Sequence, residues 1–442
     1  MNCSRRIALH YFIALPALLA LFACNVRYST AANWPAWRGG TDGSGIVSER
    51  NLPLQWSVTN NIRWRINLPG PGNSTPIVWG NRVFVAQAIE TENRRTLMCF
   101  HRADGRLLWQ NGVVYDRQEN SHKSNPFCSA SPVTDGERVI VSFGSAGVAC
   151  YNIDGQQLWH RDLGKLDHIW GNASSPILHG DLCIHYHGPS KGSFLTALDK
   201  RTGKTVWKFD EPTWNGQGRT DGFAGQTNGV IGTWSTPIVI HTGDRDELIM
   251  TFPMEVRSFD PMTGRELWKC GGLNPLHYDS AIFAEGIVVA MGGYKGNSLA
   301  VRAGGQADVT NTHRIWHQVV AKGGIGTGVI KDGYVYFAPG PVICMELKTG
   351  QTVWEKRLDR AKGGTWSSMI LAGDHIYLPM QSGDIAIIKA SPTFEQIAIN
   401  SLKESSNSSI AVSDGELFFR TKQTLWCIST AKPDTTANAG GL

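Results

Sequence analysis

The stretch Ala197–Trp207 reads ALDKRTGKTVW, and its pattern recurs along the 442-residue chain. Each copy begins with a small residue, turns at a glycine and ends its last strand with a tryptophan. Four further copies are Cys99–Trp109 (CFHRADGRLLW), Cys150–Trp159 (CYNIDGQQLW), Ser258–Trp268 (SFDPMTGRELW) and Cys344–Trp354 (CMELKTGQTVW). A looser copy ends at Trp316, and Asn61–Trp64 supplies only the strand and its tryptophan. Such regular repetition indicates a repeat architecture rather than several unrelated domains.

A second recurring unit lies between these copies and consists of two apolar strands that flank a tight turn. Asp135-Gly136 precedes VIVS, and Asp414-Gly415 precedes LFF. Residues of this kind supply the positive φ that hairpin turns need. The two units together give about eight groups of four strands at roughly 40 to 60 residues each, the period of propeller blades. The sequence therefore predicts an all-β, eight-bladed β-propeller of four-stranded antiparallel blades.

The two ends of the repeat region predict how the ring closes. The last unit, within residues 408–428, has only three strands, whereas residues 62–65 form a strand without a unit of its own. We expect this N-terminal strand to complete the last blade, which removes an open sheet edge. Blade five (residues 302–312) lacks a clean turn, and blade seven lacks the terminal tryptophan. The expected boundaries are an N-terminal arm at 33–59, the propeller at 60–430 and a disordered tail at 431–442.

The N-terminus carries the pattern of a secretory signal peptide over residues 1–32. Arg5 and Arg6 precede an apolar run at residues 7–23, and small residues follow at 29–32. Residues 21–24 (LFAC) also resemble a bacterial lipobox, in which Cys24 would be lipidated, and both alternatives stay open. Either one predicts export to the periplasm or cell envelope, with contact to the membrane only through a lipid anchor.

Composition excludes several functional classes. Hydrophobic residues make up 41% of the chain and charged residues 18%, which is typical of a globular protein. The formal net charge is only +5 and the basic residues are scattered, so no nucleic-acid partner is expected. We expect a monomer.

The cysteines fall into two groups. Cys99, Cys150, Cys344 and Cys427 occupy matching positions in different repeats, where Ala197 and Ser258 stand in others. Small size is their shared property, so we expect buried free thiols. Cys128, Cys183 and Cys270 have no such match, and a disulfide among them is left open by the predicted export. Neither a zinc-type spacing nor any other metal site is present.

The pattern Ala197-x-Asp199-x-x-Thr202-Gly203-x-x-x-Trp207 resembles the tryptophan-docking repeat of the PQQ-like, or quinoprotein alcohol dehydrogenase-like, propeller family. Residues 34–39 (WPAWRG) and 131–138 (SPVTDGER) are similar to exported members from planctomycete-type bacteria. The expected architecture is also similar to that of a propeller lipoprotein of outer-membrane protein assembly, a likeness at the level of the fold alone. The resemblance implies that one tryptophan per blade packs onto the neighbouring blade; the candidates are Trp64, Trp109, Trp159, Trp207, Trp268, Trp316 and Trp354.

The same resemblance raises the question of a quinone cofactor. A dehydrogenase of this family is expected to show an adjacent Cys-Cys pair and calcium-binding carboxylates, and this sequence has no Cys-Cys pair. Repeats alone do not make a cofactor site. No cofactor is therefore expected, with PQQ and calcium as the alternative. No catalytic residue can be assigned, because most Asp-Gly pairs here belong to turns.

Two features point to a binding site at one mouth of the propeller. Small hydroxyl residues begin each innermost strand, for example Ser174-Ser175 and Ser367-Ser368, and long polar loops cover residues 115–126 and 214–232. Such loops often carry binding functions. The candidate ligand-binding residues are His122, Asn125, His168, Trp170, Arg219, Trp234, Asp279 and Trp366. A structural alternative is that the hydroxyls only relieve crowding and that His122 and His168 only satisfy loop carbonyls.

These observations favour an exported, non-catalytic propeller that acts as a ligand- or protein-binding or assembly scaffold in the cell envelope. The expected partner is an envelope protein or a small polar or saccharide ligand. The alternative is a divergent PQQ-dependent oxidoreductase that acts on alcohols or sugars.

Overall fold

The structure, a computed structural model, describes residues 32–214, 217–226, 230–319 and 324–431. Two compact units divide the chain, Met1–Thr30 and Ala31–Leu442, and the described residues belong to the second. The predicted signal peptide with Cys24, and the tail from residue 432 on, lie outside the described residues. No helix in the described part is long and apolar enough to span a membrane.

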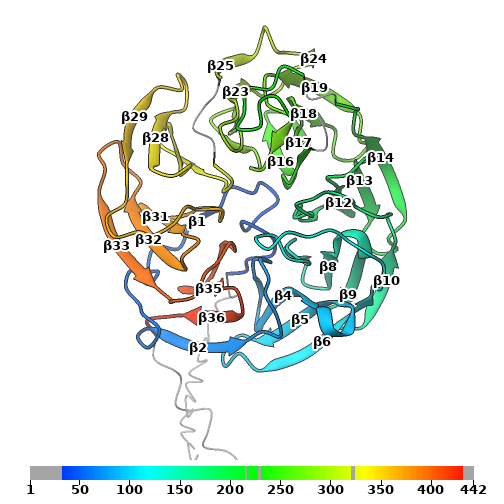
Figure 1. Cartoon of the computed structure of the whole chain (residues 1–442), viewed down its shortest axis with the longest axis vertical. Helices are drawn as coiled ribbons and strands as arrows, with labels where there is room; N and C mark the ends of the chain where they lie inside the picture. Colours follow the sequence, from blue (N-terminus) through cyan, green and yellow to red (C-terminus); the bar gives the residue numbers. More distant parts are fainter. Residues whose placement is uncertain (1–31, 215–216, 227–229, 320–323, 432–442) are drawn as a thin grey trace, which may run out of the picture. The chain divides into compact units, whose positions relative to one another are not determined.

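Eight four-stranded antiparallel blades follow one another round a ring (Figure 1), as the repeats predicted. The first four blades are β3–β6 (Ile77–Trp79, Arg82–Ile89, Arg94–His101, Leu107–Val114), β7–β10 (Val133–Thr134, Arg138–Ser142, Val148–Asn152, Gln157–Arg161), β11–β14 (Ile177–His179, Leu182–His187, Phe194–Asp199, Thr205–Asp210) and β16–β19 (Ile238–Thr242, Arg245–Phe252, Glu255–Phe259, Glu266–Gly271).

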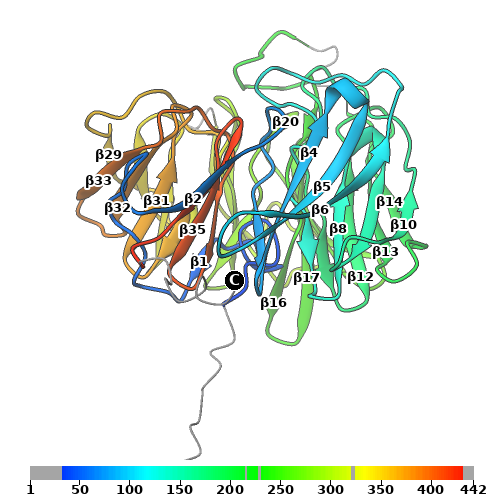
Figure 2. The same ribbon diagram turned by 90° about the horizontal axis from the view of Figure 1, so that it is seen from below.

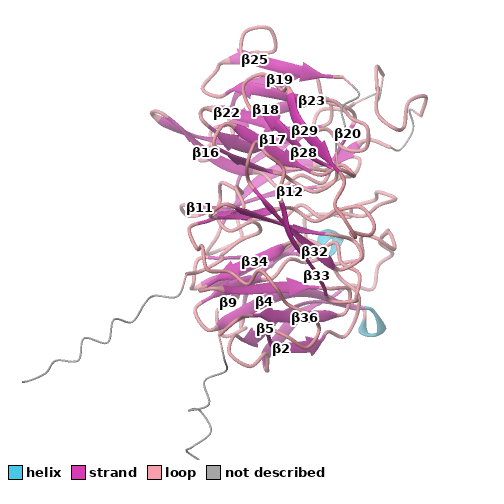
Figure 3. Ribbon diagram, turned by 90° about the vertical axis from the view of Figure 1, so that its left-hand side faces the viewer, coloured by secondary structure: helices cyan, strands magenta, loops and turns pink. Residues whose placement is uncertain are grey.

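The remaining blades are β21, β22, β23 and β25 (Ile282–Ala284, Ile287–Ala290, Ser298–Arg302, Arg314–Gln318), β26–β29 (Val329–Lys331, Tyr334–Phe337, Val342–Glu346, Thr352–Lys356), β30–β33 (Ile370–Ala372, His375–Pro379, Asp384–Lys389, Gln396–Ser401) and β34–β36 (Ile410–Ser413, Glu416–Arg420, Thr424–Ile428) with β2 (Ile62–Asn67). Short strands β1 (Ile46–Val47) and β24 (Ala307–Asp308) extend two blades, and β15 (Gly232–Thr233) pairs with β20 (Leu276–His277). The described residues also form two short helical turns, η1 (Glu90–Glu92) and η2 (Gly144–Ala146). Figure 3 colours helical segments cyan and strands magenta.

The ring closes by pairing the two ends of the described chain. Strand β2 is the outer strand of the eighth blade and lies antiparallel to β36, with Trp64 opposite Cys427 and Arg65 opposite Trp426. Figure 2 shows β2 in one blade with the C-terminal strand β35, and β36 lies between the two. The predicted closure is confirmed.

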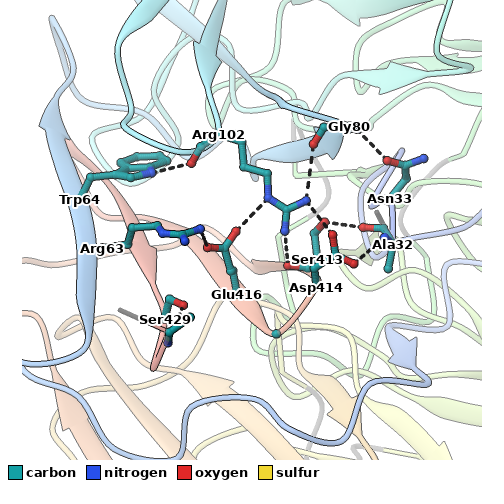
Figure 4. A network of polar contacts seen from close by, with 12 residues as sticks. Ala32, Asn33, Arg63, Trp64, Gly80, Arg102, Ser413, Asp414, Glu416 and Ser429 are labelled. Carbon is teal, nitrogen blue, oxygen red and sulfur yellow. Dashed lines mark hydrogen bonds and ion pairs between the residues drawn. The ribbon is translucent and has the colours of Figure 1, made fainter. Parts of the chain in front are cut away.

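A polar network reinforces this closure (Figure 4). The Glu416 carboxylate, whose side chain is only 4% exposed, accepts hydrogen bonds from Arg63 on β2 and from Arg102 in the first blade. Arg102 also donates to the Ser413 carbonyl at 2.6 Å and pairs with Asp414 at 3.1 Å. One carboxylate on β35 therefore joins the C-terminal strands of the eighth blade to β2 and to the first blade.

The tryptophans of the repeat connect neighbouring blades through their indole N–H groups. Trp109 Nε1 donates to the Ile153 carbonyl in the next blade at 3.1 Å, and Trp159 Nε1 to the Lys200 carbonyl at 3.0 Å. The other indoles that donate to the next blade belong to Trp64, Trp207, Trp316 and Trp354. The turn glycine lies against the indole: a Cβ at Gly155 would lie 2.5 Å from Trp109. This close approach explains why the repeat needs glycine there.

Trp268 is the exception among the seven docking candidates. Its indole N–H donates at 2.6 Å to Glu247 Oε2 within its own blade, and the ring is completely buried. The next blade is the one that lacks a clean turn, and its residue Ala307 pairs with Trp268 through the short strand β24 instead. Gly304 and Gly305 in that segment do not lie against the Trp268 ring, unlike the turn glycines of the other repeats. Only the interblade hydrogen bond is replaced at Trp268: its ring still belongs to one core cluster with Val288 and Leu299 of the next blade.

The seven described cysteines are free and buried: Cys99, Cys128, Cys150, Cys183, Cys270, Cys344 and Cys427. Burial raises their thiol pKa values, for example that of Cys99 to about 12. The expectation of buried free thiols is confirmed for the four matched positions. The disulfide left open for Cys128, Cys183 and Cys270 is not formed.

The N-terminal arm, residues 33–59, crosses the ring rather than lying on its outer rim (Figure 1). It contacts the first blade through backbone hydrogen bonds between Trp34 and Val78, the fourth through Thr41 and the seventh through β1. Arg38 holds the arm in place, because its buried guanidinium donates to five backbone carbonyls, those of Gly43, Ser44, Thr327, Gly328 and Met369. The arm is thus part of the folded core.

Candidate functional site

A closed circuit of hydroxyl groups surrounds the centre of the propeller. Each blade contributes one serine or threonine just before its innermost strand begins. The hydroxyl oxygen of this residue accepts the backbone N–H of the matching residue in an adjacent blade. The circuit runs through Thr75, Ser131, Ser175, Thr236, Ser280, Thr327, Ser368 and Ser409 and returns to Thr75. The eight distances lie between 2.8 Å at Thr236 and 3.2 Å at Thr327.

This circuit explains why the innermost strands begin with small hydroxyl residues. A buried backbone N–H without a partner is costly, and no backbone carbonyl takes these eight N–H groups. A serine or threonine from the adjacent blade is both small enough for the crowded centre and able to accept. The structural interpretation of these residues is therefore supported, and it extends beyond crowding to a direct link between blades.

A cavity of about 500 Å³ lies against this circuit. All eight circuit residues line it, as do the residues two positions earlier in each blade: Asn73, Ser129, Ala173, Trp234, Tyr278, Ile325, Trp366 and Asn407. The residue between the two points elsewhere, because side chains alternate along an extended strand. The same two positions in every blade thus form two layers of the cavity lining, the hydroxyl circuit and the residues two positions before it.

Aromatic rings form one side of the cavity. Strands β15 and β20 run parallel with Thr233 opposite His277, so the residues that follow them, Trp234 and Tyr278, stack with ring centroids 5.1 Å apart. Trp170 lies 5.9 Å from Trp234 and 5.3 Å from Phe223. Offset and tilted arrangements of this kind are favourable for aromatic pairs. The result is a continuous apolar wall supplied by blades three to five and the loop at 217–226.

Amide groups form the opposite side and fix the loop at residues 115–126 over the cavity. Asn73 and Asn407 donate from their Nδ2 atoms to the Ser124 carbonyl at 2.9 and 3.0 Å. Asn125 donates to the carbonyls of Trp170 at 2.7 Å and of Asn172 at 3.2 Å. This loop is therefore bound to blades on both sides of the cavity.

Five of the eight candidate ligand-binding residues line the cavity: His122, Asn125, Trp170, Trp234 and Trp366. For three of them the structure also shows a local role, and one of these is Trp234, whose indole N–H donates to the Gly171 carbonyl at 2.9 Å. The Asn125 amide nitrogen bonds to loop carbonyls, and His122 Nδ1 accepts the Ser124 N–H at 3.2 Å. His122 thus accepts a loop N–H, where the structural alternative expected it to satisfy a loop carbonyl.

The other three candidates are outside the lining, and each is buried behind it. His168 packs edge-on against Trp234 at 4.8 Å, and burial lowers its pKa to about 4. Arg219 forms two hydrogen bonds with Asp221, both at 2.9 Å, and donates to two carbonyls of its own loop. Asp279 stands between the two lining positions, where other blades have Ser, Ala or Gly, and burial raises its pKa well above the ordinary value. A polar residue near a predicted mouth is thus not by itself a lining residue.

Trp37 lines the cavity although it was not among the candidate residues. It belongs to the N-terminal arm, which has no strand periodicity, and its place depends on the path of that arm across the ring. Arg38 lies beside it, with Cζ 5.7 Å from the Trp37 ring centroid. The only sequence signal was the motif at residues 34–39.

The described lining contains no Asp, Glu, Lys or Arg, and seven of its 23 residues are aromatic. Arg38 is beneath the lining, and all its guanidinium N–H groups donate to backbone carbonyls. Within the described ranges, no three His, Cys, Asp or Glu side chains lie together as metal ligands would. The cavity therefore offers apolar surface, hydroxyls and amides, but no fixed charge.

A family model described as "Outer membrane protein assembly factor BamB" matches residues 41–188, 96–356 and 254–435, which together cover most of the chain. The chain belongs to this PQQ-like repeat family. No curated protein shows significant sequence similarity to it. The family assignment confirms the resemblance at the level of the repeat.

Solved structures show how widely this propeller is used. The quinohemoprotein alcohol dehydrogenase of Comamonas testosteroni is similar with a TM-score of 0.64 and 12% identity, covering 91% of this chain and 81% of the other. A europium-containing methanol dehydrogenase gives 0.65 and 10%, covering 88% and 89%. BamB from Moraxella catarrhalis gives 0.57 and 14%, covering 82% and 98%. At these identities the likeness concerns the fold alone.

Proposed function

We propose that this PQQ-like propeller is an exported binding protein that holds a neutral, saccharide-type ligand in its central cavity. The observation that carries the proposal is the lining itself: aromatic rings on one side, hydroxyls and amides around the rest, and no charged side chain among the described residues. Export follows from the signal peptide predicted at residues 1–32. The protein would act in the periplasm or cell envelope.

The chemistry of sugars matches this arrangement. A pyranose ring presents C–H groups on its faces and hydroxyls at its edge, so it can lie on an aromatic surface while its edge meets polar groups. Trp170, Trp234 and Tyr278 offer the surface, and the hydroxyl circuit offers donors. A mostly apolar pocket with a few convergent polar groups is typical of a small-ligand site.

The second candidate is a quinoprotein oxidoreductase, favoured by the likeness to alcohol and methanol dehydrogenases. The residues present do not fit that cofactor. Pyrroloquinoline quinone carries three carboxylates, which need cationic or strongly donating partners, and the described lining offers no Lys or Arg. No metal-type cluster of His, Cys, Asp or Glu accompanies it in the described part of the chain. We therefore derive no reaction step through this group.

An assembly role, which the family description names, is a further alternative. It would rest on the outer surface of the propeller, whereas the cavity is the feature that the geometry favours as a site.

The test is calorimetric titration of the mature protein with a panel of neutral and acidic oligosaccharides. We expect binding to neutral sugars, weakened at least tenfold by Trp170→Ala or Trp366→Ala and unchanged by the control Val206→Ala on an outer strand, where the side chain is 52% exposed. Full affinity in both tryptophan variants would contradict the site. Dye-linked alcohol or sugar oxidation after incubation with PQQ and calcium would instead support the oxidoreductase.

A further inference from the structure

The central cavity is closed at one end by the chain's own N-terminal arm. Trp37 is part of both the arm and the lining. The arm is anchored on several blades by backbone hydrogen bonds, from Trp34 to Val78, from Val239 to Thr41 and from Leu371 to Gly45. It is therefore a permanent floor rather than a loose cover.

Arg38 makes this floor rigid. Its guanidinium is 1% exposed and donates to two carbonyls of the arm and three of blades six and seven, at distances from 2.6 to 3.2 Å. Charge-assisted hydrogen bonds are the stronger kind. Gly45 is packed against it so closely that a Cβ there would lie 2.7 Å from Arg38 Nη2. The arm is therefore held tightly at this end of the cavity, and it would have to move for a ligand to pass.

The other end of the cavity is the entrance. Tyr294, 52% exposed, lines it together with Phe223 and the loop residues His122 and Ser124. A polymer can therefore enter only from this side. Because the floor is closed, a long chain can insert an end but cannot thread through.

The hydroxyl circuit determines which ligand groups can form hydrogen bonds in the deepest part of the cavity. Each circuit oxygen already accepts a backbone N–H, for example Ser131 from Thr75 and Ser175 from Ser131. What each hydroxyl still offers is its own O–H donor, and a serine or threonine hydroxyl has one. A sugar's terminal hydroxyl and ring oxygens are acceptors that suit this ring of donors.

We propose that the cavity recognises the chain end of a neutral oligosaccharide, with the terminal unit placed between Trp37 and the aromatic wall and the rest of the chain leaving through the entrance. This inference rests on the proposed function and adds a selectivity to it. Internal segments of a polysaccharide, which have no end to insert, would be excluded.

Matched linear and cyclic sugars test this selectivity directly, because they share composition and linkage but only the linear ones have ends. The titrations compare maltohexaose with cyclomaltohexaose, and linear with cyclic β-1,2-glucans. We expect at least a tenfold preference for the linear member of any pair that binds. Equal or tighter binding of the cyclic member would overturn end recognition while leaving the saccharide function in place.

Absence of binding by every sugar in both the pairs and the wider panel would overturn the proposed function itself, so the two failures are distinguishable. A second variant addresses the floor. Trp37→Ala should weaken binding of the linear sugar at least fivefold, whereas Trp56→Phe, a buried arm tryptophan outside the lining, should leave it unchanged. Thermal denaturation confirms that each variant is folded, and unchanged affinity in folded Trp37→Ala would contradict the placement of the terminal unit.

Discussion

Replacing Glu416 by alanine should open the seam that closes the ring. The carboxylate is almost fully buried and accepts from Arg63 on the N-terminal strand and Arg102 in the first blade. Removing one partner of a buried ion pair leaves the other charge without compensation, which typically costs 3 to 5 kcal/mol. Arg63 and Arg102 keep 20% and 11% of their side-chain surface exposed, and Arg102 retains Asp414. We therefore expect about 3 kcal/mol of lost stability, the lower end of that range.

The chain provides a matched control in another interblade ion pair. Arg82 lies 2.6 Å from Asp154, whose side chain is 68% exposed. Exposed pairs contribute about 0 to 1 kcal/mol, so Asp154→Ala should have little effect although it also removes a carboxylate that bridges two blades.

Urea unfolding followed by tryptophan fluorescence measures both variants against the unmodified protein. We expect a clear fall in the unfolding midpoint for Glu416→Ala and almost none for Asp154→Ala. Equal midpoints for the two variants would refute the view that this buried network holds the ring closed. A lower midpoint together with a changed slope would indicate that the eighth blade unfolds separately.

The remaining predictions concern the arm, the thiols and one carboxyl. Arg38→Met should cost at least about 3 kcal/mol, since buried carbonyls lose charge-assisted donors, and unfolding midpoints check this against Arg117→Met, whose side chain is 68% exposed. A chain beginning at Ala32 should show seven thiols to Ellman's reagent only after denaturation, and fast reaction of native protein would contradict their burial. Burial raises the pKa of Glu211 to about 7, against hydrogen bonding from Tyr186, so the folded state binds its proton more tightly than the unfolded state. The resulting stabilisation is present below the unfolded pKa and should be lost as pH rises from about 4.5 to 7, by up to about 3 kcal/mol. The pH dependence of the unfolding midpoint should therefore be weaker in Glu211→Gln than in the unmodified protein. Parallel pH profiles of the two proteins would contradict a contribution from Glu211.

Much of the fold could be predicted from sequence because each repeat carries the residues that define its strands and turns. The turn glycine and the tryptophan occur at fixed offsets, so blade number follows from counting copies and closure from the missing strand at one end. Trp268 differs only in its hydrogen bond, which goes to Glu247 in its own blade, because the turn of the neighbouring repeat is irregular. The sequence of a repeat predicts its own strands better than it predicts its contacts with the next blade.

The candidate site was predictable only in part. Trp234 and Trp366 were found because they sit at the register that faces the centre in every blade, whereas Trp170 lies in the connection before the third blade. Arg219 and Asp279 were misplaced because polarity in the sequence does not reveal whether a side chain is paired or buried. Trp37 was missed for a different reason, because the path of an irregular arm is set by tertiary contacts such as those of Arg38.

The circuit of eight hydroxyls ties the ring to its number of blades, because each hydrogen bond needs a blade on both sides. Every serine or threonine in it serves the backbone of an adjacent repeat rather than its own, and the last link joins Ser409 to Thr75. Deleting one repeat would leave a backbone N–H on one side of the gap without its hydroxyl acceptor on the other. The two groups could not bond, because the blades that carry them would have the wrong relative orientation. Gain or loss of a repeat in evolution would therefore require simultaneous adjustment all round the axis, whereas exchange of one repeat for another that keeps its hydroxyl would disturb only its two neighbours.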